Sequence, residues 1–573
     1  MYAYGDFRGY DAWVRESDTL DEPARDSIRA AAARLTPRPL FSLVLLDQGG
    51  PAPETAATIA SLEAQLYPEW ELRAALPAAP EHPRIRTIPP AGTLAELLAA
   101  AVAASRGEFI LPLPPGAVLA PHALYALAAS LAADPAADLL YTDEDRLDAA
   151  GHRCLPWFKT AWDPDLALAR DAVGLLAAYR RSLLDRIGGV AESSADLLLY
   201  ALSLRAGFAA PPAQIRHIGA VLCHRRVAPA WEPEAARGIV RRHLAERGEE
   251  ASLVPAPLAP LWSRVVRALP DPPPLVSIIM PTRDRAELLA RAAGAVLART
   301  EYPAIEVLIV DNESREPATR DLLAGLAADP RARVLSSPGP FNFAAISNQA
   351  ACEARGEILV LLNNDIDVIG RFWLAELVSH AVRPDVGAVG AKLLYPDGRV
   401  QHAGIVLGPG PKADHQFRFA SRHEPGPQGE CALARTVLAV TGACLAVRRA
   451  VFFEAGGMNE TDFAVAYSDV DLCLRIGELG YRIVWTPFAE LYHLECGTRG
   501  YDDTPDKAAL FEKEKKSFGM VWGALLDADP YYNPNLLQKG EILVLATPKR
   551  RACTWPAATD LPSSPATGPA ATR

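Results

Sequence analysis

The feature that most constrains the fold is an internal repeat that spans most of the chain. Four short patterns occur twice, in the same order. They are Phe41-Ser-Leu-Val-Leu and Val276-Ser-Ile-Ile-Met, Tyr67-Pro and Tyr302-Pro, Arg106-Gly-Glu and Arg355-Gly-Glu, and Leu202-Ser-Leu-Arg and Leu472-Cys-Leu-Arg. The spacing between the copies grows slowly from about 235 to about 270 residues, as loop insertions would cause, and a period this long predicts two domains of one fold.

Each copy alternates strand-like and helix-like segments. In the second copy the expected strands are 276–280, 306–310 and 358–362, and the expected helices are 285–299, 317–328, 343–353 and 372–382. Strands that alternate with helices predict a mostly parallel sheet that is covered on both faces. The expected fold class is therefore α/β.

Composition divides the chain into five segments. We expect a helical lead-in over 1–37, a first domain over 38–249, a linker over 250–274, a second domain with a C-terminal helical extension over 275–545, and a disordered tail over 546–573. The linker holds seven prolines and is expected to be an irregular connection with a short helix inside. The tail is rich in Ala, Pro, Thr and Ser, which is typical of disorder.

Charge and cysteine content exclude several classes of function. The net charge is −11 and no long basic block occurs, which argues against nucleic acid as a partner. The eight cysteines form no Cys-x-x-Cys pair, which argues against a zinc site or a disulfide framework and fits a reducing cytosol.

The sequence also predicts where the protein resides. The first residues lack the layout of a signal peptide, and no apolar run reaches the ~18 residues that a membrane span needs. We expect a cytoplasmic protein whose membrane contact is at most peripheral, on the inner face of the membrane. Lys549, Arg550 and Arg551 could touch an anionic surface there.

Two carboxylates one residue apart, Asp365 and Asp367, follow the apolar strand at 358–362. Ligands bind at the carboxyl edge of an α/β sheet, and carboxylate oxygens suit a Mg2+ or Mn2+ ion that arrives with a substrate phosphate. An acidic turn at a strand end is the alternative, so the other strand ends decide the meaning of this pair.

Further polar groups occupy equivalent places. Those after the first two strands of the second copy are Pro281, Thr282, Asp284 and Asp311. Asp311 could accept the ring N–H of a pyrimidine or simply form an Asx turn. Asp469 begins a predicted helix, where it is either an N-cap or a general base. A lone histidine such as His493 is more often structural than a ligand, and gains weight here from the acidic pair.

Seven motifs of the second copy follow one another in a characteristic order. They are Val276-Ser-Ile-Ile-Met-Pro-Thr, Ile309-Val-Asp-Asn-Glu-Ser, Leu362-Asn-Asn-Asp-Ile-Asp, Val440-Thr-Gly-Ala-Cys-Leu, Ser468-Asp-Val-Asp-Leu-Cys-Leu-Arg, His493-Leu-Glu-Cys-Gly-Thr-Arg-Gly and Asp529-Pro-Tyr-Tyr-Asn-Pro-Asn-Leu. This order resembles the inverting family-2 glycosyltransferases of GT-A fold, in particular the bacterial subgroup that builds O-antigen and related surface polysaccharides. The resemblance covers 275–536 and implies two tandem GT-A domains.

The resemblance implies a role for each candidate residue. Nucleotide-sugar binding would fall to Pro281, Thr282, Asp284, Asp311, Asn348, Asp365 and Arg499, metal binding to Asp365, Asp367 and His493, and the acceptor side to Gly442, Asp471 and Trp485. Asp469 would be the catalytic base, and Asp367 the more direct metal ligand. Cys496 and Ser468 depart from the residue types that are common at their positions.

The implied reaction is a single displacement that inverts the anomeric carbon of a UDP- or dTDP-linked sugar, with Mg2+ or Mn2+ as cofactor and a glycan or lipid-linked acceptor. One alternative is a non-catalytic glycan-binding or scaffold protein with two silent domains. Another is a nucleotidyltransferase, which would want a Gly-rich phosphate loop after the first strand. Pro281-Thr-Arg-Asp lacks that pattern.

The first copy lacks the acids that the chemistry needs. The repeat spacing places Gly116 and Val118 at the acidic pair and Leu199 at the base, and only His224 matches the second-copy histidine. We expect a catalytically silent first domain that docks on the second, binds acceptor glycan or recruits a partner. The acidic segment Tyr141-Thr-Asp-Glu-Asp is expected to be a solvated loop or an acceptor-side element rather than a displaced metal site.

Overall fold

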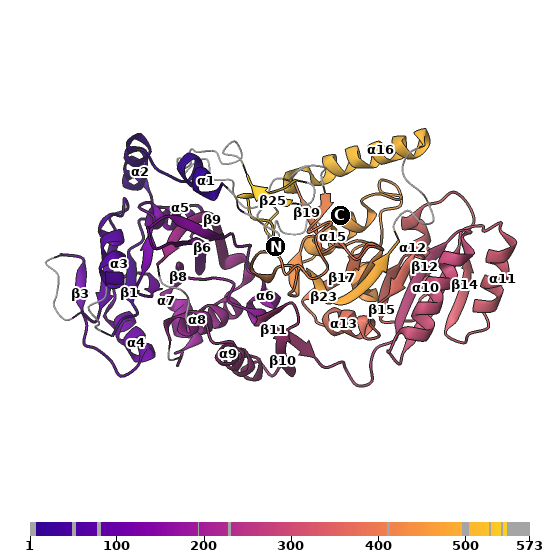
Figure 1. Cartoon of the computed structure of the whole chain (residues 1–573), viewed down its shortest axis with the longest axis horizontal. Coiled ribbons are helices and arrows are strands. Elements are labelled where there is room, and N and C mark those ends of the chain that lie inside the picture. The colour runs from indigo at the N-terminus through magenta and orange to yellow at the C-terminus, as the bar shows by residue number, and fades with distance from the viewer. Residues whose placement is uncertain are drawn as a thin grey trace.

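The structure is a computed structural model. It describes residues 7, 9–48, 53–76, 82–192, 194–226, 231–408, 413–494, 504–526, 529–539 and 542–546. Two α/β domains lie side by side along the long axis of the molecule, with a small hairpin between them (Figure 1). Each domain is built on one large sheet.

The first domain holds nine strands and nine α-helices in its described part. The strands are β1 (Phe41–Leu45), β2 (Trp70–Ala74), β3 (Ile85–Thr87), β4 (Phe109–Leu113), β5 (Ala117–Leu119), β6 (Leu139–Leu147), β7 (Arg153–Trp157), β8 (Ala177–Arg180) and β9 (Ile215–Arg225). The helices are α1 (Tyr10–Ser17), α2 (Glu22–Arg34), α3 (Pro53–Glu63), α4 (Leu94–Ala104), α5 (Ala123–Ala133), α6 (Pro164–Ala169), α7 (Arg181–Ile187), α8 (Ala195–Ala209) and α9 (Pro233–Glu246). The first two helices occupy the segment expected to be a helical lead-in.

The second domain repeats this plan. Its strands include β12 (Val276–Thr282), β13 (Ile305–Asp311), β14 (Ala332–Ser336), β15 (Ile358–Leu362), β16 (Ile366–Val368), β17 (Val386–Leu394), β18 (Val400–His402), β21 (Arg435–Val437), β22 (Cys444–Arg448) and β23 (Arg482–His493). Its helices are α10 (Ala286–Arg299), α11 (Pro317–Leu326), α12 (Phe343–Glu353), α13 (Trp373–Ala381), α14 (Arg449–Glu454), α15 (Ser468–Glu478) and α16 (Pro505–Trp522). A small ribbon of β19 (Ile405–Leu407) and β20 (Ala413–His415) lies beside the sheet.

The two sheets have the same strand order. The first runs β3-β2-β1-β4-β8-β6-β9-β5 and the second runs β14-β13-β12-β15-β22-β17-β23-β16. In both sheets the fifth strand of this order, β8 or β22, is antiparallel to the fourth, β4 or β15. The last strand, β5 or β16, is antiparallel to the strand before it, β9 or β23. The expectation of two tandem α/β domains is confirmed, although each sheet is mixed rather than mostly parallel.

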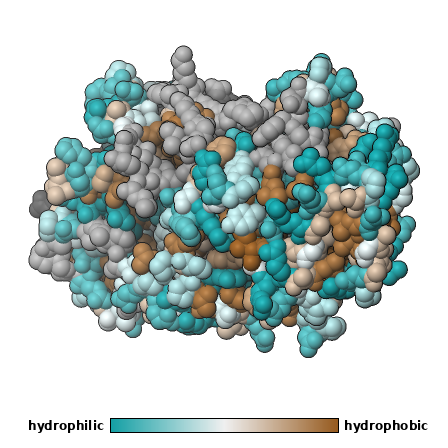
Figure 2. Space-filling view, turned by 45° about the vertical axis from the view of Figure 1, so that its right-hand side comes forward, coloured by the Kyte–Doolittle hydropathy of each residue, from teal (hydrophilic) through white to brown (hydrophobic). Residues whose placement is uncertain are grey.

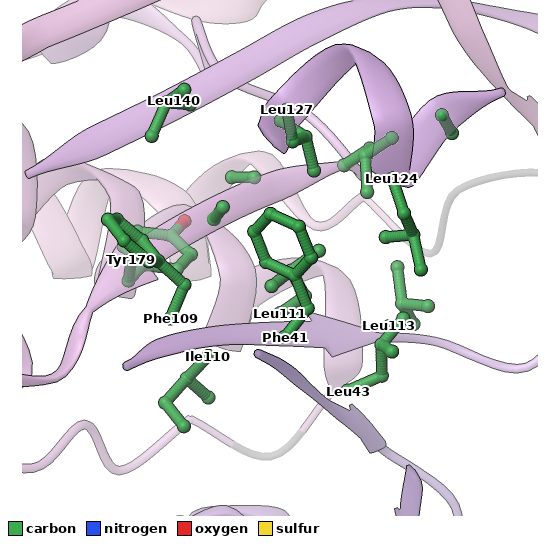
Figure 3. Packing of buried hydrophobic residues seen from close by; sticks show 14 of the residues in the cluster. Phe41, Leu43, Phe109, Ile110, Leu111, Leu113, Leu124, Leu127, Leu140 and Tyr179 are labelled. Carbon is green, nitrogen blue, oxygen red and sulfur yellow. The ribbon is translucent and has the colours of Figure 1, made fainter. Parts of the chain in front are cut away.

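Apolar strands explain why each sheet is buried on both faces. Every residue of β1, β4 and β15 is buried, which is typical of a central strand with helices on either side. In the first domain, Phe41, Leu111 and Leu113 lie on the sheet close to Leu124 and Leu127 of α5 (Figure 3). In the second domain, two separate hydrophobic clusters use alternate residues of the same strands.

The sequence patterns shared by the two copies make the same hydrogen bonds within each domain. Ser42 Oγ donates to Glu71 at 2.8 Å, and Gly107 N donates to Ser42 Oγ at 2.8 Å. The backbone N–H of Arg106 donates to the same glutamate at 2.6 Å. A Cβ on Gly107 would lie 2.5 Å from the Leu40 carbonyl oxygen, so only glycine fits there.

The second domain repeats these bonds atom for atom. Ser277 Oγ donates to Glu306 at 2.5 Å, Gly356 N donates to Ser277 Oγ at 2.8 Å, and Arg355 N donates to Glu306 at 2.7 Å. All of these groups lie at or just before the amino ends of parallel strands. The shared motifs therefore join the starts of three strands.

The segment expected to be a Pro-rich linker with a short helix forms a β hairpin instead. Its strands are β10 (Ala251–Ala256) and β11 (Ala259–Arg267), and they pack against α9 and α6. Proline is tolerated in a two-stranded ribbon because each strand has a free edge. The connection between the domains is therefore an ordered element.

A buried ionic cluster joins the two domains. Asp165 of α6 accepts from Arg383 at 2.5 Å and from Arg482 at 2.7 Å, both from the second domain. Burial alone would raise the pKa of Asp165, but the positive charges of Arg383, Arg482 and Arg267 outweigh it and hold this pKa well below its usual range. Next to it, Asp163 Oδ2 accepts from Thr436 N at 2.7 Å.

The C-terminal motif that begins at Asp529 fastens the second domain to the first. Asn533 Nδ2 donates to Asp143 Oδ2 and to the Lys159 carbonyl, both at 2.8 Å, and Asn535 Nδ2 donates to the same carboxylate at 3.3 Å. The ribbon of β24 (Leu536–Lys539) and β25 (Ile542–Leu545) continues from this point. We call the contact of Asn533 and Asn535 with Asp143 the clasp.

The clasp corrects one expectation from the sequence. The acidic segment that contains Asp143, Glu144 and Asp145 is not a solvated loop but the middle of β6, and these three residues are at most 6% exposed. Burial of these charges is tolerated because each acid has a partner. Asp143 accepts from Asn533, Asp145 pairs with Arg153 and His224, and Glu144 pairs with Lys159.

The surface in Figure 2 is largely hydrophilic, with hydrophobic residues in separate patches between hydrophilic ones. Among the described residues, no helix combines the length and the apolar character that crossing a bilayer requires. The basic residues Lys549, Arg550 and Arg551 and nearly all of the predicted disordered tail lie outside the described residues.

Candidate active site

Five elements of the second domain bring polar side chains to one edge of the sheet. The ends of β12, β13 and β15 meet there because these strands are parallel neighbours, and Thr282 of β12 is in register with Asp311 of β13. The end of β23 arrives beside β16, where His493 is in register with Ile366. This is the edge at which α/β sheets bind ligands.

Asp365 and His493 form the centre of this site. Asp365 is 5% exposed, and its Oδ1 lies 3.2 Å from His493 Nε2. The two atoms are within ion-pair range but are not aligned as a hydrogen bond, so Oδ1 is a buried oxygen without a hydrogen bond among the described residues. The other ring nitrogen, Nδ1, lies 2.6 Å from Gln401 Oε1 and donates to it. In that tautomer Nε2 carries the lone pair, and it lies 3.3 Å from Asn363 Nδ2 as well as 3.2 Å from Asp365 Oδ1.

Asp367 does not join these two residues. In an antiparallel pair, directly opposite residues share one face of the sheet and successive residues alternate. His493 lies opposite Ile366, and Asp367 lies opposite Tyr492, so the Asp367 side chain points to the other face. There it forms an ion pair with Arg299 of α10. Asp367 thus pairs with Arg299 in this structure, and its role as the more direct metal ligand stays a prediction.

The residues present fit a divalent cation that shares its coordination with a substrate. Within the described ranges no group of three or more His, Cys, Asp or Glu side chains forms a complete metal site. Mg2+ and similar ions are commonly held by one or two protein ligands plus substrate phosphates. The 3.2 Å between Asp365 Oδ1 and His493 Nε2 is close to the ~2.9 Å between adjacent corners of an octahedron with bonds of about 2.0–2.1 Å.

Asp469 lies in the first turn of α15, where the helix dipole favours a carboxylate. Its Oδ2 accepts from Gly442 N at 2.7 Å, and its Oδ1 accepts from Val470 N at 2.9 Å. Burial raises the pKa of Asp469 above its usual value, against the lowering effect of these bonds and of the Thr441 side chain. A half-buried carboxylate with a raised pKa is suited to accept a proton. Gly442, expected on the acceptor side, thus donates directly to Asp469, the candidate base.

The residues expected around the nucleotide divide into two groups. Thr282, which follows Pro281 at the end of β12, accepts from Asn364 Nδ2 at 2.9 Å, which ties β12 to the turn that carries Asp365. Asp311 Oδ1 accepts from Ser314 N at 3.0 Å. Asp284 Oδ1 likewise accepts from two backbone N–H groups of the next loop, at 2.6 and 2.8 Å. Both aspartates thus make turn bonds, and for Asp311 this is the Asx-type turn that the sequence left as an alternative.

Three predicted site residues have structural roles. Asn348 uses its amide on the backbone of Met458, donating to the carbonyl at 2.9 Å and accepting from N–H at 2.8 Å. Asp471 accepts from Arg475 at 2.9 Å and from Trp522 at 3.0 Å. Trp485 is completely buried in the core. None of these three side chains points its polar atoms into the site, because the fold already uses or encloses them.

Arg499, expected to reach the diphosphate, lies outside the described residues, and so does Cys496.

Sequence reasoning missed the residues that support the base. Tyr467, two positions before Asp469, has a left-handed backbone with φ of 61°, a conformation that costs free energy in a non-glycine residue. Its ring stacks on Phe518 of α16 at 4.7 Å between centroids. Glu514 of the same helix accepts from Val465 N and Ala466 N at 3.1 and 2.8 Å. Helix α16 therefore holds the segment that leads into α15.

Comparison with known proteins agrees with this geometry. Residues 277–452 match the family model described as Glycosyl transferase family 2. Over this range the second domain is similar to family-2 glycosyltransferases. Its matched region covers β12 to α14 and includes Asp365.

Relatives extend over both domains. The chain is 39% identical to the O-antigen biosynthesis protein RfbC of Myxococcus xanthus over 92% of this chain and 42% of that protein. It is 35% identical to an uncharacterized protein of Sinorhizobium fredii over 95% of this chain and 62% of that protein. The chain therefore spans about half the length of these relatives.

Shorter relatives match less of the chain. An N-acetylglucosaminyl-diphospho-decaprenol L-rhamnosyltransferase of Mycobacterium tuberculosis is 28% identical over 39% of this chain and 76% of its own length. A solved structure of a mannosyltransferase from Pyrobaculum calidifontis in complex with GDP-Man and Mn2+ aligns with a TM-score of 0.32 and 20% identity, over 51% of this chain and 76% of that one.

Proposed function

We propose that the protein is a metal-dependent glycosyltransferase that moves a sugar, with inversion, from a nucleoside-diphosphate donor to a glycan or lipid-linked acceptor in surface-polysaccharide assembly. The observation that carries the proposal is the meeting of two chemically different groups at one sheet edge. Asp469 is a half-buried carboxylate with a raised pKa, and Asp365 with His493 offers an anionic oxygen and a nitrogen lone pair.

In the proposed reaction, Asp469 accepts the proton of the acceptor hydroxyl as the hydroxyl oxygen bonds to the anomeric carbon. The bond between that carbon and the diphosphate oxygen breaks on the opposite side, so the configuration inverts. A divalent cation held by Asp365 and His493 would offset the charge of the departing diphosphate. Thr282 and Asp311, side by side at the ends of β12 and β13, would hold the nucleoside.

The biological setting rests on the relatives. One long relative is named as an O-antigen biosynthesis protein and a shorter one as a rhamnosyltransferase that acts on a diphospho-decaprenol-linked sugar. Both names support an acceptor that is a growing glycan or a lipid-linked sugar. The nucleotide is part of the proposal itself, with UDP- and dTDP-linked sugars as the donors to examine first.

The direct experiment is a screen of UDP- and dTDP-linked sugars with Mn2+ or Mg2+, measuring release of nucleoside diphosphate by the full chain. We expect at least one donor to be turned over, the rate to vanish with EDTA, and the rate to return when the metal is restored. Turnover of no donor, or a rate that EDTA does not change, would contradict the proposal. With an acceptor, an α-linked donor should give a β-linked product, detected by NMR.

A further inference from the structure

The first domain contains a cavity where the second domain has its catalytic site. The cavity has a volume of about 190 Å³. Its wall includes Leu199 of α8, which the repeat aligns with Asp469, and Arg225 at the end of β9. Arg225 lies opposite Ala117 as His493 lies opposite Ile366, so the strand register places Arg225, and not His224, at the position of His493. Gly174, at the place of Gly442, also lines it. The first domain has thus kept an opening at this edge of the sheet although it lacks the acidic pair.

Three aromatic side chains line this cavity, together with seven charged ones. Trp157 of β7, Trp231 and Trp262 of β11 all line it, so three of the ten tryptophans of the chain face one small volume. Tryptophan offers a broad apolar face together with an N–H group. Such walls with a few well-placed polar groups are typical of small-molecule sites.

The indole rings are held in place by the surrounding side chains. The Arg170 guanidinium lies 4.9 Å from the centre of the Trp157 ring and 5.7 Å from that of Trp262, and Lys159 Nζ lies 4.6 Å from the Trp157 ring. Cations over an aromatic face are attracted to it. Trp231 Nε1 donates to the Leu261 carbonyl at 3.1 Å, which fixes this ring to the hairpin.

The polar part of the wall balances its charges. Glu144 Oε2 accepts from Lys159 Nζ at 2.9 Å and from Leu175 N at 2.8 Å, and Asp196 accepts from Arg225 at 2.7 Å. The wall holds four carboxylates (Glu144, Asp145, Asp171 and Asp196) and three arginines (Arg146, Arg170 and Arg225), and Lys159, which pairs with Glu144, brings the cations to four. A ligand with a net charge would disturb this balance, whereas hydroxyl groups could donate to the carboxylates and accept from the arginines.

The rim of the cavity is apolar and locally strained. Leu155 is 65% exposed and has a φ of 48°, and Leu261 is 60% exposed on the opposite strand ribbon. A non-glycine residue in the left-handed region costs free energy and occurs preferentially at functional sites. Two large exposed leucines at the mouth of an aromatic cavity are typical of a binding surface.

We propose that this cavity binds a neutral sugar residue of a glycan chain. A pyranose ring has an apolar face of C–H groups and a rim of hydroxyls, which match the indole faces and the balanced ionic wall. The volume is below the roughly 300–1,000 Å³ of sites for drug-sized ligands, so it suits one sugar unit rather than a nucleotide sugar. The acidic pair itself is absent, because Gly116 and Val118 occupy its place. Glu144 and Asp196, which line the cavity, are already paired with Lys159 and Arg225.

The binding itself is independent of catalysis, but its purpose rests on the proposed function. If the second domain transfers sugars to a glycan, the bound residue belongs to the acceptor chain, and the first domain holds that chain while the second extends it. The cavity lies at the junction of the domains, since its wall also includes Trp262 of the hairpin and Gln428 of the second domain. This place allows one glycan to reach both domains.

The test is saturation-transfer difference NMR on the full chain with methyl glycosides of glucose, galactose, mannose, rhamnose and N-acetylglucosamine, and with methyl glucuronide as the charged probe. We expect at least one neutral glycoside to bind, with the strongest signals on the C–H protons of one ring face. The signal should persist with saturating UDP and Mn2+, because these occupy the second domain.

Variants locate the binding. Trp231→Ala should weaken the affinity about tenfold, Trp231→Phe should largely retain it, and Phe372→Ala, which removes an exposed aromatic ring of the second domain, should leave it unchanged. Circular dichroism establishes that each variant is folded. The proposal is overturned if no glycoside binds, if only the glucuronide binds, or if binding is insensitive to Trp231→Ala and Trp262→Ala and is displaced by UDP with Mn2+. Because no transfer is measured, an inactive second domain would not affect the result.

Discussion

The first and second domains share a fold and differ at one edge of it. The residues common to both, such as the pairs Ser42 with Glu71 and Ser277 with Glu306, lie at the amino ends of the strands and make the same bonds. At the carboxyl ends the second domain has Asp365 and Asp469, where the first has Gly116 and Leu199. The comparison teaches that this fold does not need the acids, so their presence in one copy is explained by chemistry.

The difference extends to how each domain uses its acids. In the first domain, Asp143 accepts from Asn533 of the clasp, and Asp145 pairs with Arg153 and His224. In the second domain, Asp365 keeps a buried oxygen without a hydrogen bond among the described residues. Buried polar atoms are normally satisfied. An acid whose bonds are complete serves structure, and an acid with an open oxygen is available for a ligand.

The largest expected effect is on turnover. Asp469→Asn removes the proton acceptor but keeps the shape of the side chain, so kcat should fall by about 10²–10⁴-fold, the usual contribution of general base catalysis. Asp321→Asn, on the exposed side of α11, is the matched control and should retain the rate. Initial rates of donor turnover with acceptor measure both, and equal rates would remove Asp469 from the mechanism.

The same carboxylate predicts a pH dependence. The base must be ionised to accept a proton, and burial raises the pKa of Asp469 above the ordinary value of about 3.9. Activity should therefore be lost as the pH falls through that raised pKa, and the acidic limb of kcat/KM should lie above pH ~4. A profile that stays flat down to pH ~4 would count against this assignment.

A smaller effect is expected on nucleotide binding. A histidine of the first domain supplies the control variant. His493→Ala removes a proposed metal ligand and should weaken Mn2+-dependent binding of the nucleoside diphosphate by about 10–100-fold, comparable to the loss of groups that support a metal. His224→Ala removes a histidine of the first domain that pairs with Asp145 and lies one register position from the counterpart of His493, and it should leave this affinity unchanged. Calorimetry measures both; equal losses would mean that the two histidines have the same role.

The next comparison concerns stability, and the expected loss of stability is the same in both domains. A Cβ at Gly107 or Gly356 would lie 2.5–2.6 Å from backbone or hydroxyl atoms at the start of a neighbouring strand. Gly107→Ala and Gly356→Ala should each destabilise their own domain by about 1–3 kcal/mol, the usual cost of overpacking. Differential scanning calorimetry should show similar shifts, and an unchanged profile for either variant would show that the motif is not structural there.

An effect on stability of similar size is expected from opening the clasp. Asn533→Ala leaves Asp143 Oδ2 with one bond fewer, and a buried acceptor that loses a partner costs about 1–3 kcal/mol. The C-terminal segment should become more sensitive to limited proteolysis, while donor turnover by the second domain is retained. Unchanged proteolysis would show that the clasp does not hold the segment in place.

Much of the fold followed from the sequence because its signals are local. The strand 358–362 and the helix 343–353 have the predicted bounds, since apolar runs and helical spacing are read residue by residue. The hairpin at 251–267 was missed because its prolines suggested an irregular linker, and only its packing on α6 and α9 makes a ribbon stable there. Pairing with distant elements is not visible in a local pattern.

The site was predicted less completely for the same reason. Asp365, Asp469 and His493 lie where their motifs suggested, at strand and helix ends. Asp367 and Trp485 do not, because the register of β16 with β23 turns one away and the core encloses the other. A motif identifies which residues occur together, but only the register and burial decide which side chains reach the same space.

The central claim is that one domain of the pair binds donor and the other does not. The most direct measurement is isothermal titration of the full chain with UDP or dTDP in the presence of Mn2+, repeated with Asp365→Ala. The account predicts one binding site per chain, and loss of that site in the variant. Two sites per chain, or a single site that survives Asp365→Ala, would contradict it.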